Sequence, residues 1–522
     1  MVEMLETAIR SWNGVVSRRR LLGSLSALAV GVVANPSAAF ARPWAQPPLP
    51  PTLPTVITQL PDTLEGASQS ERDMIEACVA RGNPLSFDIA ARSPSEAVAS
   101  CMARREAEER RGGHAPSPLQ QLLGDTPLTE SRLGLNNWPL MEEEEELDIG
   151  HFRFAISPHM VFVDDGRQRF LLFGNGPLVG GFRGTDYLEN VQRRVFDRAV
   201  WAMSNGRHAT AVVELDRPLS PEKVARIIRA LHGYGVRTIV WGNEPNDPGA
   251  AWRDNLPELV KTLSTAADVK KREGLDDLEL ALPGMAYFGE GEYLQKLLGT
   301  FDSLLPGWAN GSSKFLPFQR VADHYYGPID GFLQRLTRMR ETMAKVGLND
   351  LKFDLAEVGN PTVNSGQTPA TDGQLAEGYI PQITSLAVAS GMMDRLYFYS
   401  ALDGGEDRFS LTRIENGRLV KKPSYLALTT MARLLARISS VSWSESEETM
   451  RVDGTRSDGV EFTVVWSKVA GRDVTVPLPA GKRVFDALGA EVEEPNPQQV
   501  VLKPREHPSL GGAARILLSR RP

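Results

Sequence analysis

Cysteine is scarce in this chain of 522 residues, and both cysteines, Cys78 and Cys101, lie in its first fifth. Neither has a histidine at the spacing of a zinc ligand, so the sequence predicts no zinc site. In an oxidising compartment the two thiols could pair and close a loop of 101 − 78 = 23 residues. Two buried free thiols are the alternative.

An excess of positive charge is also missing. The chain has 58 lysines and arginines against 65 aspartates and glutamates, a formal net charge of −7. No lysine-rich or arginine-rich stripe interrupts its interior, which argues against a nucleic-acid partner. A neutral or weakly charged partner fits this surface better.

Hydrophobic runs of membrane-spanning length are missing as well. The stretch Leu21 to Val33 is shorter than the roughly 20 apolar residues that a spanning helix needs. It follows Ser17-Arg18-Arg19-Arg20 and precedes the small-residue site Ala39-Phe40-Ala41. We interpret residues 1–41 as a twin-arginine-type export signal. The alternatives are an ordinary secretion signal and an uncleaved tether, and with cleavage the mature chain has no integral membrane span. We expect the protein to be periplasmic or extracellular.

No internal repeat is evident, and the remaining sequence divides into three parts. Residues 42–149 begin with a proline-rich spacer around Pro47–Pro51, become partly helical, and end near the acidic run Glu142–Glu146. We interpret that run as a solvated linker, with a calcium site as the alternative. Residues 150–437 alternate short apolar strands with helical segments, the pattern of a parallel sheet built from βα repeats. Residues 438–522 have the short alternating segments of a small antiparallel β-sandwich.

The six later repeats of the middle part are distinct, and they indicate an α/β fold of the (βα)8 TIM-barrel type. Their strands are expected at Ala209–Leu215, Arg237–Trp241, Leu278–Leu282, Val321–Tyr325, Lys352–Ala356 and Arg395–Tyr399. The first two candidate strands, 152–156 and 170–173, are too close for a helical crossover, so we expect a hairpin around residues 164–166. The first barrel repeat therefore stays unassigned.

Two glutamates follow strand-like runs in this barrel. Glu244 lies in Trp241-Gly242-Asn243-Glu244-Pro245, and Glu357 lies in Leu355-Ala356-Glu357-Val358-Gly359, 357 − 244 = 113 residues later. At about 30 residues per repeat, two strand-helix units separate them, and both side chains should reach the barrel mouth. A pair of carboxyl groups facing one another is what glycosidic bond cleavage requires.

Asn243-Glu244-Pro245, His324-Tyr325-Tyr326 and the later Glu357 together resemble the clan A retaining glycoside hydrolases, in particular family 39 and its relatives. The resemblance runs from about Gly150 to the end of the chain and includes Lys422-Pro423-Ser424-Tyr425 and the closing sandwich. It implies that Glu244 is the general acid and base and that Glu357 is the nucleophile. It also implies that Asn243 binds the 2-hydroxyl of the sugar, that His324 contacts the sugar or Glu244, and that Tyr326 hydrogen-bonds Glu357.

The chain departs from the clan at the eighth strand, where many members have a tryptophan platform for the sugar. Tyr397 and Tyr399 stand there instead, and a tyrosine offers less stacking area. Trp241, Trp252 and Trp308 are other candidate platforms.

These observations predict a secreted β-glycosidase that acts by double displacement on an oligo- or polysaccharide, with no metal and no organic cofactor. Inverting hydrolysis is the alternative within enzymology. A non-hydrolytic glycan-binding or polysaccharide-assembly protein on the same barrel is the alternative outside it, although an intact pair of glutamates argues against a degenerate site.

Overall fold

We describe the chain from a computed structural model. The described residues are 117–124, 126, 130–136, 149–157, 171–172, 208–213, 215, 218–233, 235–247, 250, 252, 254–286, 290–304, 318–360, 370–401, 410–415 and 418–520. The predicted export signal, the proline-rich spacer, both cysteines and the acidic run lie outside them. Within these ranges, no helix is both long enough and apolar enough to cross a membrane.

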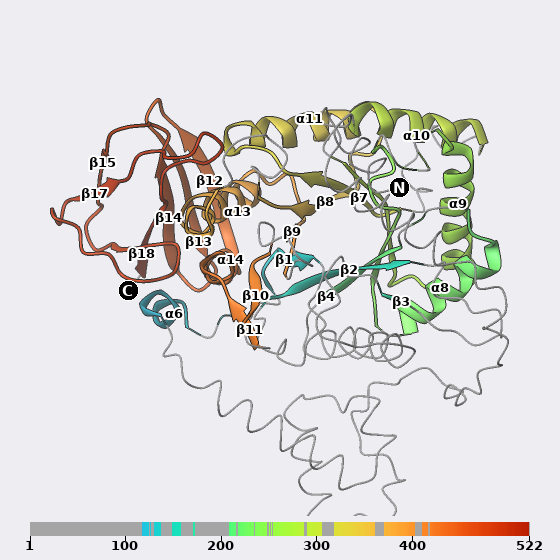
Figure 1. Ribbon diagram of the computed structural model, residues 1–522, viewed down its shortest axis with the longest axis horizontal. Coiled ribbons are helices and arrows are strands. Elements are labelled where there is room, and N and C mark those ends of the chain that lie inside the picture. The colour runs from blue at the N-terminus through green and yellow to red at the C-terminus, as the bar shows by residue number, and fades with distance from the viewer. Residues whose placement is uncertain are drawn as a thin grey trace, which may run out of the picture. The chain divides into compact units, whose positions relative to one another are not determined.

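Parallel strands form a closed barrel at the centre of the described region (Figure 1). Across the described ranges, eight of them pair in the ring order β1-β9-β8-β7-β6-β5-β4-β2, and β1 also pairs with β2 to close it. Their bounds are β1 Leu133–Asn136, β2 His151–Ser157, β4 His208–Val213, β5 Thr238–Trp241, β6 Glu279–Met285, β7 Arg320–Tyr325, β8 Lys352–Val358 and β9 Arg395–Phe398. The six predicted later strands are therefore confirmed, as is the TIM-barrel fold.

Helices connect the strands and lie outside the ring. They are α8 (Pro221–Gly233), α9 (Leu256–Arg272), α10 (Glu290–Leu304), η4 (Ile329–Gly331), α11 (Phe332–Lys345), α12 (Asp372–Gln374), the π-helical turn η5 (Leu375–Tyr379), α13 (Ile380–Ala389) and α14 (Pro423–Leu434). Figure 1 shows α9, α10 and α11 along the right and upper sides of the barrel. The buried face of α8 consists of apolar residues spaced three and four apart, Val224, Ile227, Ile228 and Leu231.

The first barrel strand lies before residue 150, the predicted start of the barrel, so that boundary is wrong. Strand β1 joins the ring between β9 and β2. It has only four residues, Leu-Gly-Leu-Asn, too few for a recognisable strand pattern. The predicted hairpin is supported, because the short strand β3 (Leu171–Leu172) pairs antiparallel with β2. Strand β3 lies outside the ring of eight parallel strands.

Side chains along each barrel strand alternate between the interior of the ring and the layer of helices. One interior layer consists of small side chains, Val212, Val240, Ala281, Ala322 and Ala356. Their neighbours in sequence, such as Ile239 and Leu355, belong to the large core between strands and helices. The small interior layer leaves space for longer polar side chains at both ends of the barrel.

A buried ionic network fills the barrel where the strands begin. Arg320, 1% exposed, contacts Glu279 at 2.5 Å, Asp354 at 2.7 Å and Asp394 at 2.6 Å. Burial opposes the charge of Glu279, but the hydrogen bond and charge of Arg320 outweigh it and lower the Glu279 pKa to about 2. Because the charges are mutually paired, this end of the barrel is suited to stability and not to chemistry.

Two histidines stack beside this network. The rings of His151 and His208 lie 4.7 Å apart between centroids and are inclined by 18°. Burial lowers the pKa of both histidines, and repulsion from the charge of Arg395 is the second cause. The pKa of His151 falls well below 6.5. Both imidazoles are therefore neutral in the folded protein near neutral pH.

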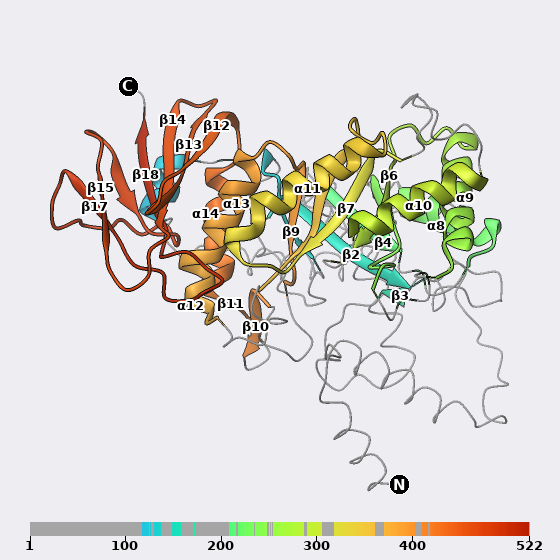
Figure 2. The ribbon, with the colours of Figure 1, turned by 90° about the horizontal axis from the view of Figure 1, so that it is seen from above.

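Antiparallel sheets follow the barrel. A five-stranded sheet has the order β12-β13-β14-β18-β16, and β15 and β17 form a second sheet. Valines and leucines between them form a separate core. Figure 2 shows α13 and α14 between these sheets and the barrel. The bounds are β10 Thr412–Glu415, β11 Arg418–Lys421, β12 Ile438–Glu445, β13 Thr449–Arg456, β14 Val460–Ser467, β15 Val474–Pro477, β16 Arg483–Phe485, β17 Gln499–Leu502 and β18 Arg515–Arg520, and helix α6 (Pro118–Leu123) precedes the barrel.

The histidine stack predicts a loss of stability in mild acid. Below about pH 6.5 the unfolded chain binds protons at these histidines that the folded chain does not, so stability decreases as the pH decreases. We expect the urea midpoint to fall between about pH 7.5 and about pH 5.5, above the range where carboxylates titrate. His208→Gln should make this slope shallower. A midpoint that stays constant or rises toward acid would contradict the prediction.

Candidate active site

Glu244 is held at the mouth of the barrel by an unusual backbone conformation. Its φ is 45°, in the left-handed region, which costs a residue with a side chain about 1 to 3 kcal/mol. Two backbone hydrogen bonds offset this cost, because Glu244 N donates to Gly284 O at 2.7 Å and Asp247 N donates to Glu244 O at 2.9 Å. This turn separates the end of β5 from the next segment and directs the Glu244 side chain over the barrel.

Asn246 fixes the same turn to the next strand. Its side-chain Nδ2 donates to Ala286 O at 3.0 Å, and Ala286 N donates to its Oδ1 at 2.7 Å. The amide thus replaces one step of strand pairing beyond the end of β6. The turn that carries Glu244 is anchored on both sides.

Glu357 points inward because β8 departs from regular alternation. Ala356 belongs to the interior layer, so a regular strand would direct Glu357 outward. The pairing register with β7 skips Ala356, passing from Asp323–Leu355 to His324–Glu357. This irregularity lets two consecutive residues face the interior, as β-bulges do near active sites.

Arg153 and Tyr326 hold the two oxygens of Glu357. Arg153 Nη1 donates to Oε1 at 3.0 Å, and the Tyr326 hydroxyl donates to Oε2 at 2.6 Å. The side chains of Arg153 and Glu357 are only 2% and 3% exposed. A cationic donor and a hydroxyl donor in such a dry setting stabilise the ionised carboxylate.

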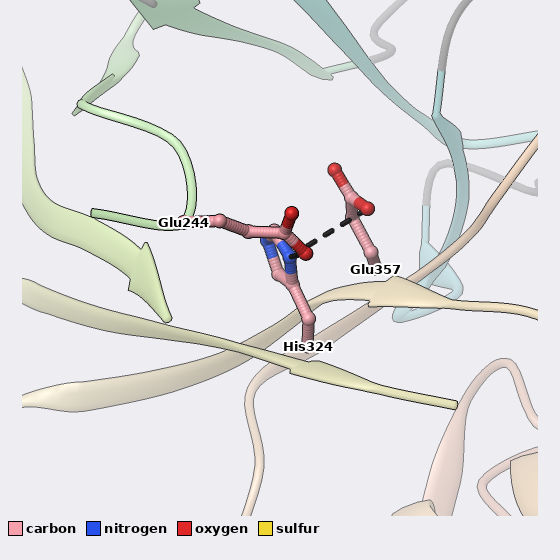
Figure 3. A group of neighbouring side chains, drawn as sticks. All are labelled: Glu244, His324 and Glu357. Carbon is pink, nitrogen blue, oxygen red and sulfur yellow. Dashed lines mark hydrogen bonds and ion pairs between the residues drawn. The ribbon is translucent and has the colours of Figure 1, made fainter. Parts of the chain in front are cut away.

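His324 lies between the two glutamates, as Figure 3 shows. Its Nδ1 is 2.9 Å from Glu244 Oε1 and 3.6 Å from Glu357 Oε2, and its side chain is fully buried. Its Nε2 has no hydrogen-bond partner among the described residues. An orphaned buried N–H is rarer than an orphaned acceptor, so we assign the hydrogen to Nδ1.

The two carboxyl groups face one another. One oxygen of Glu244 lies within 4.8 Å of one oxygen of Glu357. Their surroundings differ, because the Glu244 side chain is 15% exposed whereas that of Glu357 is 3% exposed. One carboxyl group is therefore accessible to solvent, and the other is buried among donors.

The remaining predicted residues separate into two groups. Asn243 accepts a hydrogen bond from Arg153 Nη2 at 3.1 Å, which leaves its amide N–H groups for another partner. The ring of Tyr399 meets that of Tyr326 edge to face at 6.3 Å, so both tyrosines border the cluster.

Trp241 does not join the site. It is fully buried in the core between strands and helices, whereas its neighbour Val240 faces the interior, so it cannot stack against a sugar. Trp252 is buried in the same core, and Trp308 lies outside the described residues.

Arg153 is the residue of this cluster that the sequence did not predict. It lies in the strand His151-Phe152-Arg153-Phe154, where the apolar neighbours drew attention to the strand and not to the charge. The position of an arginine in the middle of a barrel strand could have indicated its role. A charged side chain is buried only when it has partners, so such an arginine predicts a buried carboxylate nearby.

Glu244, His324 and Glu357 also form a set of donors that could hold a metal ion. Both oxygens of Glu357 already accept hydrogen bonds, one of them from the cationic Arg153. A divalent cation would have to compete with this positive charge. The arrangement is therefore better suited to proton transfer and nucleophilic chemistry.

No family model and no curated protein matches the chain. Similar solved structures include a family 39 glycoside hydrolase from the gut symbiont Bacteroides cellulosilyticus WH2, at 15% identity over 76% of this chain and 82% of that one, with a TM-score of 0.49. They also include the catalytic domain of the family 30 xylanase C from Talaromyces cellulolyticus, at 10% identity over 75% and 96%, with a TM-score of 0.46. A glucosidase from Croceicoccus marinus shares 13% identity over 77% and 98%, with a TM-score of 0.44. The likeness concerns fold alone.

The Arg153–Glu357 pair gives a test that needs no substrate. Arg153→Met leaves a buried carboxylate without its cation, and we expect a loss of about 3 kcal/mol or more in unfolding free energy. Adding Glu357→Gln removes that charge and should restore part of the loss. The control is Arg226→Met, because Arg226 pairs with Glu222 at the surface and should change stability by less than about 1 kcal/mol. Urea unfolding of the four proteins measures this, and equal losses for Arg153→Met and the control would contradict the pairing.

Proposed function

We propose that the protein is a retaining β-glycosidase that hydrolyses O-glycosidic bonds in an oligo- or polysaccharide. The observation that carries this proposal is the approach of Glu244 and Glu357 to within 4.8 Å at the mouth of a closed barrel. Retaining enzymes separate their carboxyl groups by about 5 to 5.5 Å, whereas inverting enzymes need about 6.5 to 9.5 Å to admit a water molecule. A contact this close between the nearest oxygens supports retention.

In the first step, a carboxylate oxygen of Glu357 attacks the anomeric carbon while the bond from that carbon to the leaving oxygen breaks. Glu244 gives its proton to the departing oxygen and becomes a carboxylate. The product of this step is a glycosyl ester on Glu357. Arg153 and Tyr326 favour the ionised Glu357 that the attack requires.

In the second step, Glu244 takes a proton from water, and the water oxygen attacks the anomeric carbon. The ester bond breaks, and Glu357 leaves as a carboxylate. Two inversions restore the original anomeric configuration. The exposure of Glu244 suits this role, because the same group must meet first the leaving oxygen and then water.

Asn243 and the tyrosines would bind the sugar. Arg153 occupies the Asn243 carbonyl oxygen, so the amide turns its N–H groups to other partners. A 2-hydroxyl of the bound sugar is the acceptor that we propose. The amino-terminal sequence supports the further proposal that the enzyme works beyond the inner membrane, on a cell-surface or environmental glycan.

Catalytic roles can be separated with variants on any substrate found in a screen of aryl β-glycosides and natural glycans. Glu357→Gln should abolish turnover. Glu244→Gln should lose about 10²- to 10⁴-fold in kcat/KM on substrates with poor leaving groups and much less in kcat/KM on dinitrophenyl glycosides, whose first step needs no acid. Glu222→Gln, an exposed carboxyl change, is the control. Proton NMR of the first-formed product should show the β-anomer, and a 2-deoxy-2-fluoro glycoside should label Glu357.

A first-formed α-anomer, or full activity in Glu357→Gln, would refute the proposed mechanism. Glycan binding with no turnover on any substrate would instead favour the non-hydrolytic alternative.

A further inference from the structure

We infer that Gly284 and Gly359 are positioning residues, one for each carboxyl group of the site. Each lacks the side chain that would displace a ring bound to that carboxyl group. The inference deepens the proposed glycosidase function and rests on it for its kinetic consequences, while its structural basis is independent of activity.

Gly284 lies in β6 between Glu244 and His324. Its carbonyl accepts the backbone N–H of Glu244 at 2.7 Å. A Cβ placed on Gly284 would lie 2.6 Å from His324 Nε2 and 3.3 Å from Cε1. The Nε2 side of the imidazole therefore packs against Gly284. Its Nδ1 atom faces both glutamates.

Gly359 follows Glu357 by two residues. A Cβ placed there would lie 2.5 Å from Cε1 and 3.0 Å from Cδ1 of Tyr326, and 3.2 Å from the carbonyl oxygen of Tyr399. The Tyr326 ring thus passes directly over Gly359 to reach Glu357. On its other side, the carbonyl of Tyr399 leaves the added carbon little room to shift.

The requirement for glycine is steric at both positions. The φ angle of neither glycine lies in the left-handed region, so alanine can adopt both backbone conformations. Real Cβ atoms essentially never approach heavy atoms within 3.0 Å, so an alanine forces the ring to move. The rings are the ends of side chains, and a rotation of either one breaks its hydrogen bond to the carboxyl group.

The two substitutions should therefore have different kinetic effects. Gly284→Ala displaces His324 from Glu244, so it should impair proton donation, with a loss near 10²-fold in kcat/KM on substrates with poor leaving groups and a smaller loss on dinitrophenyl glycosides. Gly359→Ala displaces Tyr326 from Glu357, so it should impair nucleophilic attack on both kinds of substrate. In the pH profile of kcat/KM, Gly284→Ala should shift mainly the limb set by the proton donor Glu244. Gly359→Ala should shift mainly the limb set by the nucleophile Glu357.

Gly299→Ala is the matched control. Gly299 is exposed in α10, and a Cβ there would meet nothing within 4 Å. This variant should keep the kinetics of the parent protein and should not lower its urea midpoint, because alanine is the better helix former.

A double-mutant comparison tests the steric cause without any substrate. Gly284→Ala should lower the urea midpoint of the parent protein but not that of His324→Ala, in which no ring remains to be displaced. Gly359→Ala should behave in the same way toward Tyr326→Ala. If Gly284→Ala fails to fold, His324→Ala should restore folding to the double variant.

Equal losses in both backgrounds, or no restoration of folding, would overturn the inference, because the glycine would then act through the backbone. Coupled midpoints without the predicted leaving-group dependence would uphold the steric contacts and refute their kinetic role. Coupled midpoints in a protein that cleaves no glycan would refute the proposed function alone.

Discussion

The buried charge of Glu357 is the constraint on which the site depends. A carboxylate that is 3% exposed is stable only with partners, and its partners come from two other strands of the ring, one of them several strands away. Arg153 comes from β2, and Tyr326 follows β7, whereas Glu357 itself lies in β8. The ionised site therefore exists only when the barrel is closed. Closure depends in turn on β1, the four-residue strand that joins β9 to β2.

The two ends of the barrel handle buried charge in different ways. At the start of the strands, Arg320 contacts three carboxylates, and the network is satisfied within the protein. At the mouth, two carboxyl groups face one another with one arginine beside the deeper of them. This second arrangement leaves negative charge that the proposed glycosidase reaction would use. The small interior layer between the ends gives both groups of long side chains their space.

Much of the barrel and both carboxyl groups of the candidate site could be predicted from the sequence. The predictions that were wrong or missing have physical causes. Long βα repeats gave six strands, and the Asn243-Glu244-Pro245 motif and the later Glu357 gave both carboxyl groups. Strand β1 is too short to show a period. Trp241 was predicted to be a sugar platform because tryptophan stacks well against sugars. Side chains alternate along a strand, and Val240 faces the barrel interior, so Trp241 faces the helices. The sequence alone does not tell which of the two faces is the interior. The inward aim of Glu357 depends on a register shift that no local pattern encodes.

The distance between the glutamates also supports the different roles proposed for them. Two negative charges within 4.8 Å of each other repel by about 3 to 4 kcal/mol at an effective dielectric constant near 20. The free site therefore favours one proton shared between the two carboxyl groups. Because Arg153 stabilises the charge of Glu357, the proposed mechanism places the proton on Glu244. Glu244 is the more exposed of the pair, so the group proposed to carry the proton is also the one more accessible to a leaving oxygen and to water. Charge and access thus both support the proposed roles of Glu244 as the acid and Glu357 as the nucleophile.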